Sequence, residues 1–208
     1  MRGVLKRPPA IGLTGGLGAG KSTVASLLRR RGITVLDADA VVREALEPGG
    51  AAHARVVRLL GPGIMAAGGR LDRRTIAARI FRDRALRRKL ENILHPIVGQ
   101  FFRREAAARR RGPLVLDVPL LFESGLDRRV DKTVVVWAPW STRLRRLVRS
   151  GRLSAPDARL REKAQMPLAQ KRRRANFVIN NSGSLNSLSS QVAGLAAKIR
   201  SAKIRSGD

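Results

Sequence analysis

Short apolar runs alternate along the chain with longer segments in which apolar residues recur every three or four positions. Such runs predict buried strands, and a recurrence near 3.6 residues predicts helices with one buried face. The predicted strands are Ala10–Thr14, Thr34–Asp37, Leu114–Asp117, Lys132–Trp137 and Phe177–Ile179. Helix-like segments follow the strands, beginning with Lys21–Arg31. The alternation predicts an α/β protein of three layers with a five-stranded, mostly parallel sheet.

Three regions of helical periodicity add to this sheet. Val41–Arg111 has few strand signals, and its glycine pairs predict that it is broken into short helices, with Asp72 and Asp83 as N-caps. We expect this region to be an insertion over the carboxyl edge of the sheet, where ligands of open α/β sheets bind. The arginine-rich Ser154–Ala175 suits a helical lid. In Leu185–Ile204 a helical spacing predicts packing on the sheet through five residues: Leu185, Leu188, Val192, Leu195 and Ile199.

The length of 208 residues suits one domain. We expect a core of about 9–45, 112–150 and 176–208, an acceptor-binding helical insertion of about 46–111, and a lid of about 151–175.

The composition excludes several classes of protein. The chain has no Cys, which excludes disulfides, thiol nucleophiles and Cys-based metal sites. No apolar stretch approaches the roughly 20 residues of a membrane span, and the basic start MRGVLKRPPA has no apolar signal-peptide core after it. We therefore expect a cytoplasmic protein with no membrane partner.

A net charge of +28 is the most prominent bulk property, and it suggests nucleic acid as a partner. However, the 35 Arg and 8 Lys are spread along the whole chain. The basic runs contain no aromatic residue on which a base could stack, and Tyr is absent. We therefore predict no specific nucleic-acid binding.

The most informative segment is Gly15–Ser22, which reads GGLGAGKS between the first strand and the first helix. This is the P-loop pattern Gly-x-x-x-x-Gly-Lys-Ser/Thr in its expected surroundings. Its glycines let successive N–H groups converge on an anion, and the helix dipole favours negative charge at the same point. Lys21 would reach the β- and γ-phosphates, and Ser22 would ligate Mg²⁺. The segment predicts binding of a nucleoside triphosphate.

Acidic residues end the second and third strands, on the same edge of the predicted sheet. In Asp37-Ala38-Asp39, one carboxylate can orient or accept the proton of an acceptor hydroxyl, and the other interpretation is a helix cap. We favour Asp39 for the reaction centre. Leu114–Asp117 reads like a Walker B strand, which makes Asp117 a candidate Mg²⁺ ligand.

These motifs, with others, resemble the dephospho-coenzyme A kinase family. The matching segments occur in the family's order over about residues 11–184. They are TGGLGAGKST (14–23), DAD (37–39), HP (95–96), DVPLLFESGL (117–126), QMP (165–167), Lys171 and FVINNSGS (177–184). The resemblance implies a P-loop kinase fold and ATP-dependent phosphorylation of the ribose 3′-hydroxyl of dephospho-coenzyme A, with ATP and Mg²⁺ as cofactors.

The resemblance also implies roles for individual residues. Asp39 corresponds to the proposed catalytic base, Lys21 to the loop lysine, and Arg149 to a lid arginine at the transferring phosphate. The ATP-phosphate loop corresponds to Leu17, Gly18, Ala19, Gly20, Lys21, Ser22 and Thr23. His95, Phe122 and Glu123 correspond to the acceptor side, although His95 alone would be interpreted as a helix-end residue before Pro96.

Three positions depart from the family pattern: Ser150, Asn176 and Asn180. The last two replace acids, so an ion pair to a lid arginine is lost there, and we expect altered lid or nucleotide affinity.

Two alternative functions stay open from the sequence. One is a nucleoside or nucleotide kinase, against which the DAD, HP and PLLFE elements speak. The other is an RNA-associated P-loop NTPase, which requires a one-sided basic surface. We expect a monomer or a weak homo-oligomer.

Overall fold

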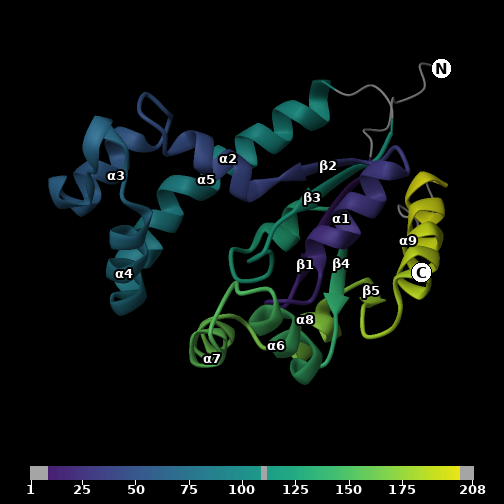
Figure 1. Ribbon diagram of the computed structural model, residues 1–208. Coiled ribbons are helices and arrows are strands. Elements are labelled where there is room, and N and C mark those ends of the chain that lie inside the picture. The colour runs from purple at the N-terminus through teal and green to yellow at the C-terminus, as the bar shows by residue number, and fades with distance from the viewer. Residues whose placement is uncertain (1–8, 109–111, 202–208) are drawn as a thin grey trace, which may run out of the picture. The chain divides into compact units, whose positions relative to one another are not determined.

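A computed structural model describes residues 9–108 and 112–201 of the chain (Figure 1). The described residues form two compact units. The core unit holds residues 9–36, 106–108 and 112–201, and the insertion unit is Asp37–Glu105. The start of the chain, the end of the predicted insertion at 109–111 and the last residues of the predicted terminal helix, 202–204, lie outside the described residues.

All five predicted strands are present and form one sheet. They are β1 (Ala10–Gly15), β2 (Thr34–Asp37), β3 (Leu114–Asp117), β4 (Lys132–Trp137) and β5 (Phe177–Asn180), in the order β2-β3-β1-β4-β5. β1 pairs in parallel with β3 and β4, and β4 pairs in parallel with β5. The central strand β1 is buried along its whole length, which is why it reads as a continuous apolar run.

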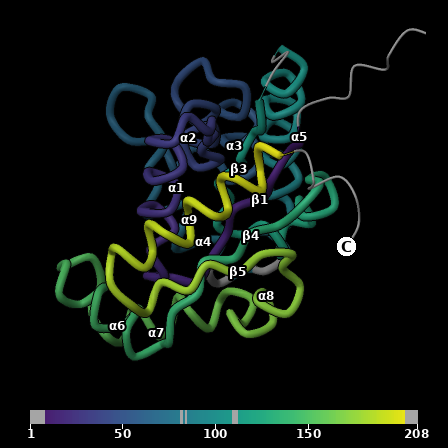
Figure 2. Tube along the Cα trace, turned by 90° about the vertical axis from the view of Figure 1, so that its right-hand side faces the viewer, coloured from purple at the N-terminus to yellow at the C-terminus, as the bar shows by residue number. Residues whose placement is uncertain are grey.

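Helices cover both faces of this sheet. α1 (Lys21–Arg30) and α9 (Leu185–Arg200) pack on one face through the main hydrophobic cluster, which includes Ile11, Leu13, Val115, Val134 and Val136 of the strands. Figure 2 views the sheet from this side, with α9 in front of the strands. Residues of opposite parity point to the other face, where Val135 packs with Phe122 and with Leu168 of α8 (Leu168–Arg174).

The segment predicted as a lid is divided between two helices, α7 (Ala155–Lys163) and α8. They follow α6 (Trp140–Arg149), and a short helix η3 (Leu126–Arg129) precedes β4. In α9, four of the five predicted packing residues are buried, but Leu185 is 72% exposed. It was predicted to pack and does not, because it is the first residue of the helix, directly after its N-cap Ser184.

The insertion unit has its own apolar core. It contains α2 (Ala38–Ala45), α3 (His53–Leu60), η1 (Pro62–Ile64), η2 (Ala67–Gly69) and α4 (Arg73–Arg82), together with most of α5 (Arg84–Ala108). Its core includes Ala52, Val56, Ile64, Ile76 and Leu90. None of the helices in the part of the chain that the structure describes is long and apolar enough to cross a membrane.

The prediction of short helices throughout the insertion is wrong for its second half. α5 runs for 25 residues and contains Pro96. Proline removes one helical hydrogen bond, but the helix continues on both sides because an apolar stripe packs on the unit's core. His95 therefore lies inside a helix and not at its end.

Both predicted N-caps are present. The Asp72 side chain accepts hydrogen bonds from the N–H groups of Arg74 and Thr75, and Asp83 accepts one from Leu86 at the start of α5. The Thr75 hydroxyl also donates to Asp72 at 2.6 Å. The side-chain bond from Thr75, followed by the two backbone bonds, holds the pKa of Asp72 below its ordinary value.

We predict that Asp72→Ala lowers the thermal midpoint more than Asp72→Asn does, because Asn can still cap the helix. A carboxylate with a lowered pKa in the folded state stabilises the protein above its unfolded pKa, and this contribution is lost as the pH falls through the folded pKa. The gap between wild type and Asp72→Asn should therefore shrink below about pH 4. Thermal melts by circular dichroism at several pH values measure this, and a constant gap would contradict the assignment.

Candidate active site

The loop between β1 and α1 has the backbone geometry of an anion site. Gly18 and Gly20 have φ angles of 74° and 88°, in the left-handed region that glycine adopts at low cost. The Ala19 N–H donates to the Gly16 carbonyl at 3.0 Å, which closes the loop into a tight turn. Gly20 is the N-cap of α1 and supplies no side-chain bond to the first N–H groups of the helix. The start of α1 can therefore donate to a bound anion.

Lys21 and Asp117 are brought together at the mouth of this loop. Leu13 of β1 lies opposite Asp117 of β3 in the sheet, so Asp117 ends its strand beside the segment that enters the loop. The Lys21 ammonium donates to the Asp117 carboxylate as an ion pair. Their side chains are 21% and 8% exposed, so the pair is partly shielded from water. The arrangement places one cation and one carboxylate next to the N–H groups of the loop.

The segment after β3 is fixed by a buried lysine. Lys171 of α8 is fully buried, and its ammonium lies 2.7 Å from a Glu123 carboxylate oxygen and 3.2 Å from the Pro119 carbonyl. The same Glu123 oxygen accepts the N–H of Met166, and the Thr14 hydroxyl donates to Pro119 at 2.9 Å. Glu123, Met166 and Lys171 were identified separately in the sequence. The structure brings them together beside the strand that leads into the loop.

Phe122, the second predicted acceptor residue of this segment, is largely buried. It packs with Val135 and Leu168, and the guanidinium of Arg174 lies 4.7 Å from the centre of its ring. Arg174 also pairs with Asp127 at 2.9 Å. Both Phe122 and Glu123 thus hold the fold of the core unit, and their contact with an acceptor stays a prediction.

Arg149 and the three departures from the family pattern lie at the ends of elements. Arg149 is exposed in the last turn of α6, and Ser150 caps that helix with a bond from its hydroxyl to the Leu147 carbonyl. Asn176 accepts the N–H of Thr133 at 2.8 Å, and Asn180 accepts from Ser182. Each Asn uses its side-chain oxygen as an acceptor, which an aspartate can also do. An asparagine at these two positions therefore preserves the local hydrogen bonds and removes the negative charge.

In the insertion unit the two acids of the DAD segment have different roles. The Asp37 side chain accepts the N–H groups of Asp39 and Ala40 at 2.9 and 3.3 Å, so Asp37 is the N-cap of α2. Asp39 lies in the first turn of α2 and is exposed. Since Asp37 caps the helix, the carboxylate of Asp39 is not required for capping. His95 lies in the same unit, near the middle of α5.

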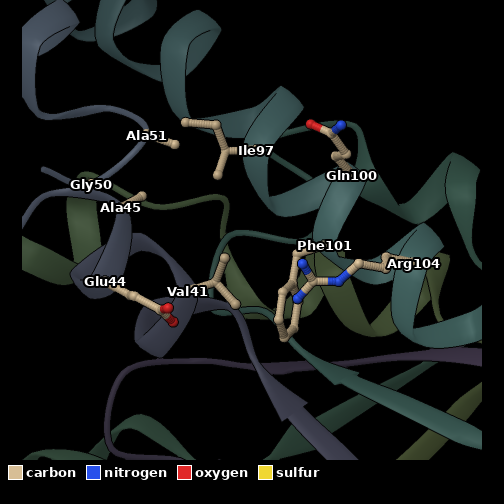
Figure 3. A pocket seen from close by; sticks show the side chains of 9 residues that line it. All are labelled: Val41, Glu44, Ala45, Gly50, Ala51, Ile97, Gln100, Phe101 and Arg104. Carbon is tan, nitrogen blue, oxygen red and sulfur yellow. The ribbon is translucent and has the colours of Figure 1, made fainter. Parts of the chain in front are cut away.

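A hollow of about 390 Å³ lies within the insertion unit (Figure 3). Its lining joins α2, the loop at Gly50 and the second half of α5, with residues Val41, Glu44, Ala45, Gly50, Ala51, Ile97, Gln100, Phe101 and Arg104. At about 100° per residue, the α2 residues that line it lie on the side of the helix opposite to Asp39. The hollow and the predicted base therefore use different faces of α2.

Two residues that contact the loop Gly15–Ser22, Arg143 and Asn181, were not predicted from the sequence. Arg143 is 3% exposed and donates to the Leu17 carbonyl, and the Asn181 amide donates to the Ala19 carbonyl. A signal for Arg143 exists in the sequence, because it falls between Trp140 and Leu147 on the apolar stripe of α6. A charged residue on such a stripe indicates a buried partner. Asn181 lies in the segment FVINNSGS that resembles the family, but no pattern in the sequence indicates a contact with the loop.

The family model and the curated relatives indicate one family. The family model described as "Dephospho-CoA kinase" matches residues 9–187. The dephospho-CoA kinase of Anaeromyxobacter dehalogenans is 44% identical over 198 residues, which cover 94% of each chain. The dephospho-CoA kinase of Deinococcus radiodurans is 46% identical over 191 residues and 89% of each chain. Among solved structures, TT1252 from Thermus thermophilus matches with a TM-score of 0.82 and 39% identity, over 93% of this chain and 98% of that one.

We predict that Glu123→Gln destabilises the protein by about 3 kcal/mol, because it leaves the buried ammonium of Lys171 without a carboxylate. The double variant Glu123→Gln/Lys171→Met should recover part of this loss, since it removes the unpaired charge as well. Urea unfolding measures both. Glu47→Gln is the control, because Glu47 pairs with Arg73 in a half-exposed ion pair that should contribute less than about 1 kcal/mol. A Glu123→Gln variant as stable as this control would contradict the assignment.

Proposed function

The chain belongs to the dephospho-CoA kinase family, and from this premise we propose which of its residues carry the reaction. The family enzyme phosphorylates dephospho-CoA with ATP as the phosphoryl donor. The observation that carries the proposal is the loop Gly15–Ser22 with Lys21 held against Asp117 at its mouth. Such a transfer needs little covalent chemistry from the protein, so its residues act by positioning and by stabilising charge.

We assign the ATP phosphates to the loop from Leu17 to Thr23. The N–H groups of the glycine-rich turn and of the first turn of α1 donate to phosphate oxygens, and the helix dipole adds to the attraction. Lys21 neutralises charge on the phosphates, and its pairing with Asp117 holds the ammonium at the loop beforehand. Arg149 is assigned to the charge that develops on the transferring group.

The residues beside the loop fit a magnesium ion. A hydroxyl from Ser22 and a carboxylate from Asp117 are hard oxygen ligands, and Mg²⁺ is usually held by one or two such groups together with substrate phosphates. The described residues contain no group of three or more His, Cys, Asp or Glu that could hold a metal ion. A bound Mg²⁺ would neutralise phosphate charge and orient the oxygens.

Asp39 is the proposed base for the acceptor hydroxyl. It lies in the first turn of α2 and is exposed, while Asp37 caps the helix. A carboxylate in this position can accept the proton of the ribose 3′-hydroxyl as the hydroxyl attacks the γ-phosphorus. His95, Phe122 and Glu123 are assigned to the acceptor side, the last two as parts of the segment that Lys171 fixes.

The test of this function is acceptor-dependent ADP release from ATP by nucleic-acid-free protein with Mg²⁺. We expect release with dephospho-CoA, coenzyme A as the product, and little release with AMP or adenosine. Lys21→Ala should abolish turnover, because it removes the phosphate-binding ammonium. Preferential activity on AMP or adenosine would contradict the assigned acceptor.

We predict that Asp39→Asn lowers kcat by about two to four orders of magnitude, since the amide cannot accept the proton. Asp37→Asn is the matched control from the same segment, because an asparagine retains the capping oxygen, and it should keep most of the turnover. Steady-state kinetics at saturating ATP and dephospho-CoA measure both. Equal losses in the two variants would remove Asp39 from the role of base.

We also predict that chelation of divalent cations by EDTA stops turnover and that excess Mg²⁺ restores it. Asp117→Asn should raise the Mg²⁺ concentration needed for half-maximal rate, because the ligand loses its charge. Glu47→Gln removes an equal charge from the exposed surface and should keep the wild-type requirement. An unchanged requirement in Asp117→Asn would exclude Asp117 as a ligand.

A further inference from the structure

Two carbonyl groups of the phosphate loop are held by side chains from outside the loop. The Leu17 carbonyl accepts a hydrogen bond from Arg143 Nη1 of α6 at 3.0 Å. The Ala19 carbonyl accepts one from Asn181 Nδ2, directly after β5, at 2.8 Å. Both donors are buried, with exposures of 3% and 7%, so water competes little for these carbonyls.

The direction of these carbonyls fixes the direction of the neighbouring N–H groups. A trans peptide unit is planar, so the carbonyl of one residue and the N–H of the next point to opposite sides. The Leu17 carbonyl shares its plane with the Gly18 N–H, and the Ala19 carbonyl shares its plane with the Gly20 N–H. A carbonyl held toward Arg143 therefore turns the Gly18 N–H away from Arg143. In the same way, the bond from Asn181 to the Ala19 carbonyl turns the Gly20 N–H away from Asn181.

Arg143 is itself anchored on three sides. Its Nε donates to the Ala138 carbonyl at 3.0 Å, and its two terminal nitrogens make a two-pronged ion pair with Glu162 of α7 at 2.8 and 2.7 Å. The guanidinium also lies 4.9 Å from the centre of the Trp140 ring. A planar, two-pronged pair holds a guanidinium in one orientation, which a lysine in its place would not do.

The loop and Arg143 are in close contact. A Cβ atom added at Gly16 would lie 2.8 Å from Arg143 Nη1, and one at Gly18 would lie 2.9 Å from the Arg143 carbonyl. A side chain at Gly16 would have to displace the side-chain ends of Arg143 and Leu168, and one at Gly18 would meet the backbone of α6. The guanidinium is therefore packed on the loop as well as bonded to it.

We propose that Arg143 is a positioning residue for ATP binding, held in place by Glu162 of α7. It keeps the Leu17 carbonyl on the outside of the loop, so that the Gly18 N–H faces the phosphates. Arg143 does not contact the phosphates in this assignment and acts through the loop. The inference rests on the proposed role of the loop in binding ATP phosphates, and it adds a link from the loop to α7, within the segment expected to act as a lid.

The test compares ATP affinity with acceptor affinity in Arg143→Met, which keeps the side-chain length and removes every donor. Hydrogen bonds of charged groups are strong, so we expect the Kd for ATP, measured by titration calorimetry with Mg²⁺, to rise about tenfold or more. The KM for dephospho-CoA at saturating ATP should change less than about threefold, because the acceptor does not use the loop carbonyl. Arg145→Met removes the same charge from an exposed position of α6 and should leave both constants near wild type.

Glu162→Gln keeps Arg143 and removes the charge that anchors it. We expect a smaller rise in the Kd for ATP, and no further rise when Glu162→Gln is added to Arg143→Met, because Glu162 acts only through Arg143. If Arg143→Met fails to fold, Glu162→Gln carries the test by itself. We then expect a raised Kd for ATP and a KM for dephospho-CoA close to that of the wild type.

Two results would overturn the inference. One is wild-type ATP affinity in Arg143→Met, or in Glu162→Gln where that variant carries the test. The other is an equal loss of ATP and dephospho-CoA affinity together with a lower melting temperature, which would make the role of Arg143 general to the fold. The variant Lys21→Ala distinguishes these two results from a failure of the proposed role of the loop in binding ATP phosphates. If Lys21→Ala leaves ATP affinity unchanged while Arg143→Met lowers it, the loop is not the phosphate site.

Discussion

A backbone loop can bind an anion only if its N–H groups point inward, and the carbonyl groups in the same peptide planes then point outward. In this chain the requirement extends well beyond the eight residues of the loop. Arg143 and Asn181 come from α6 and from the end of β5, more than 120 residues later in the chain, and each holds one carbonyl. β5 lies at one edge of the sheet, and α6 begins after β4. The two places thus supply the side chains that hold the loop after β1.

Acidic residues are scarce in this chain, with 15 Asp and Glu against 43 Lys and Arg, so the place of each acid matters. Three acids in the core unit hold basic residues of α6 and α8: Glu162 pairs with Arg143, Glu123 with Lys171, and Asp127 with Arg174. The first two of these pairs contain a buried cation, whose charge would be costly without the partner. These three pairs tie α6 and the arginine-rich segment to the rest of the core unit.

The sequence predicts the sheet well and the contacts around the loop poorly. Buried parallel strands read as apolar runs, and the bounds of β2, β3 and β4 were predicted to the residue. The glycine pattern of the loop and the acid at the end of β3 follow from local chemistry, so Lys21 and Asp117 could be named in advance. Arg143 could not, because its partners at Leu17, Ala138 and Glu162 lie in separate segments that only tertiary packing brings together.

Two errors have physical causes that local patterns do not contain. The sequence around His95-Pro96 predicts a helix end, but packing of the α5 stripe on the insertion core outweighs the lost hydrogen bond at Pro96. Leu185 fits the helical spacing of α9, but the first residue of a helix lies at its end and does not reach the sheet. The sequence also left both Asp37 and Asp39 open as caps, and the hydrogen bonds assign the cap to Asp37.

The glycines of the loop satisfy two requirements at once, and this affects how substitutions there are interpreted. Gly18 and Gly20 have positive φ angles, the conformation with which a loop of this kind turns successive N–H groups toward an anion. A Cβ at Gly20 would also clash with Asn181 Nδ2, and one at Gly16 would meet Arg143. A substitution at either position would displace a side chain that orients a carbonyl, even where the backbone angle is acceptable. Loss of nucleotide binding in such a variant would therefore report on packing around the loop as much as on the loop itself.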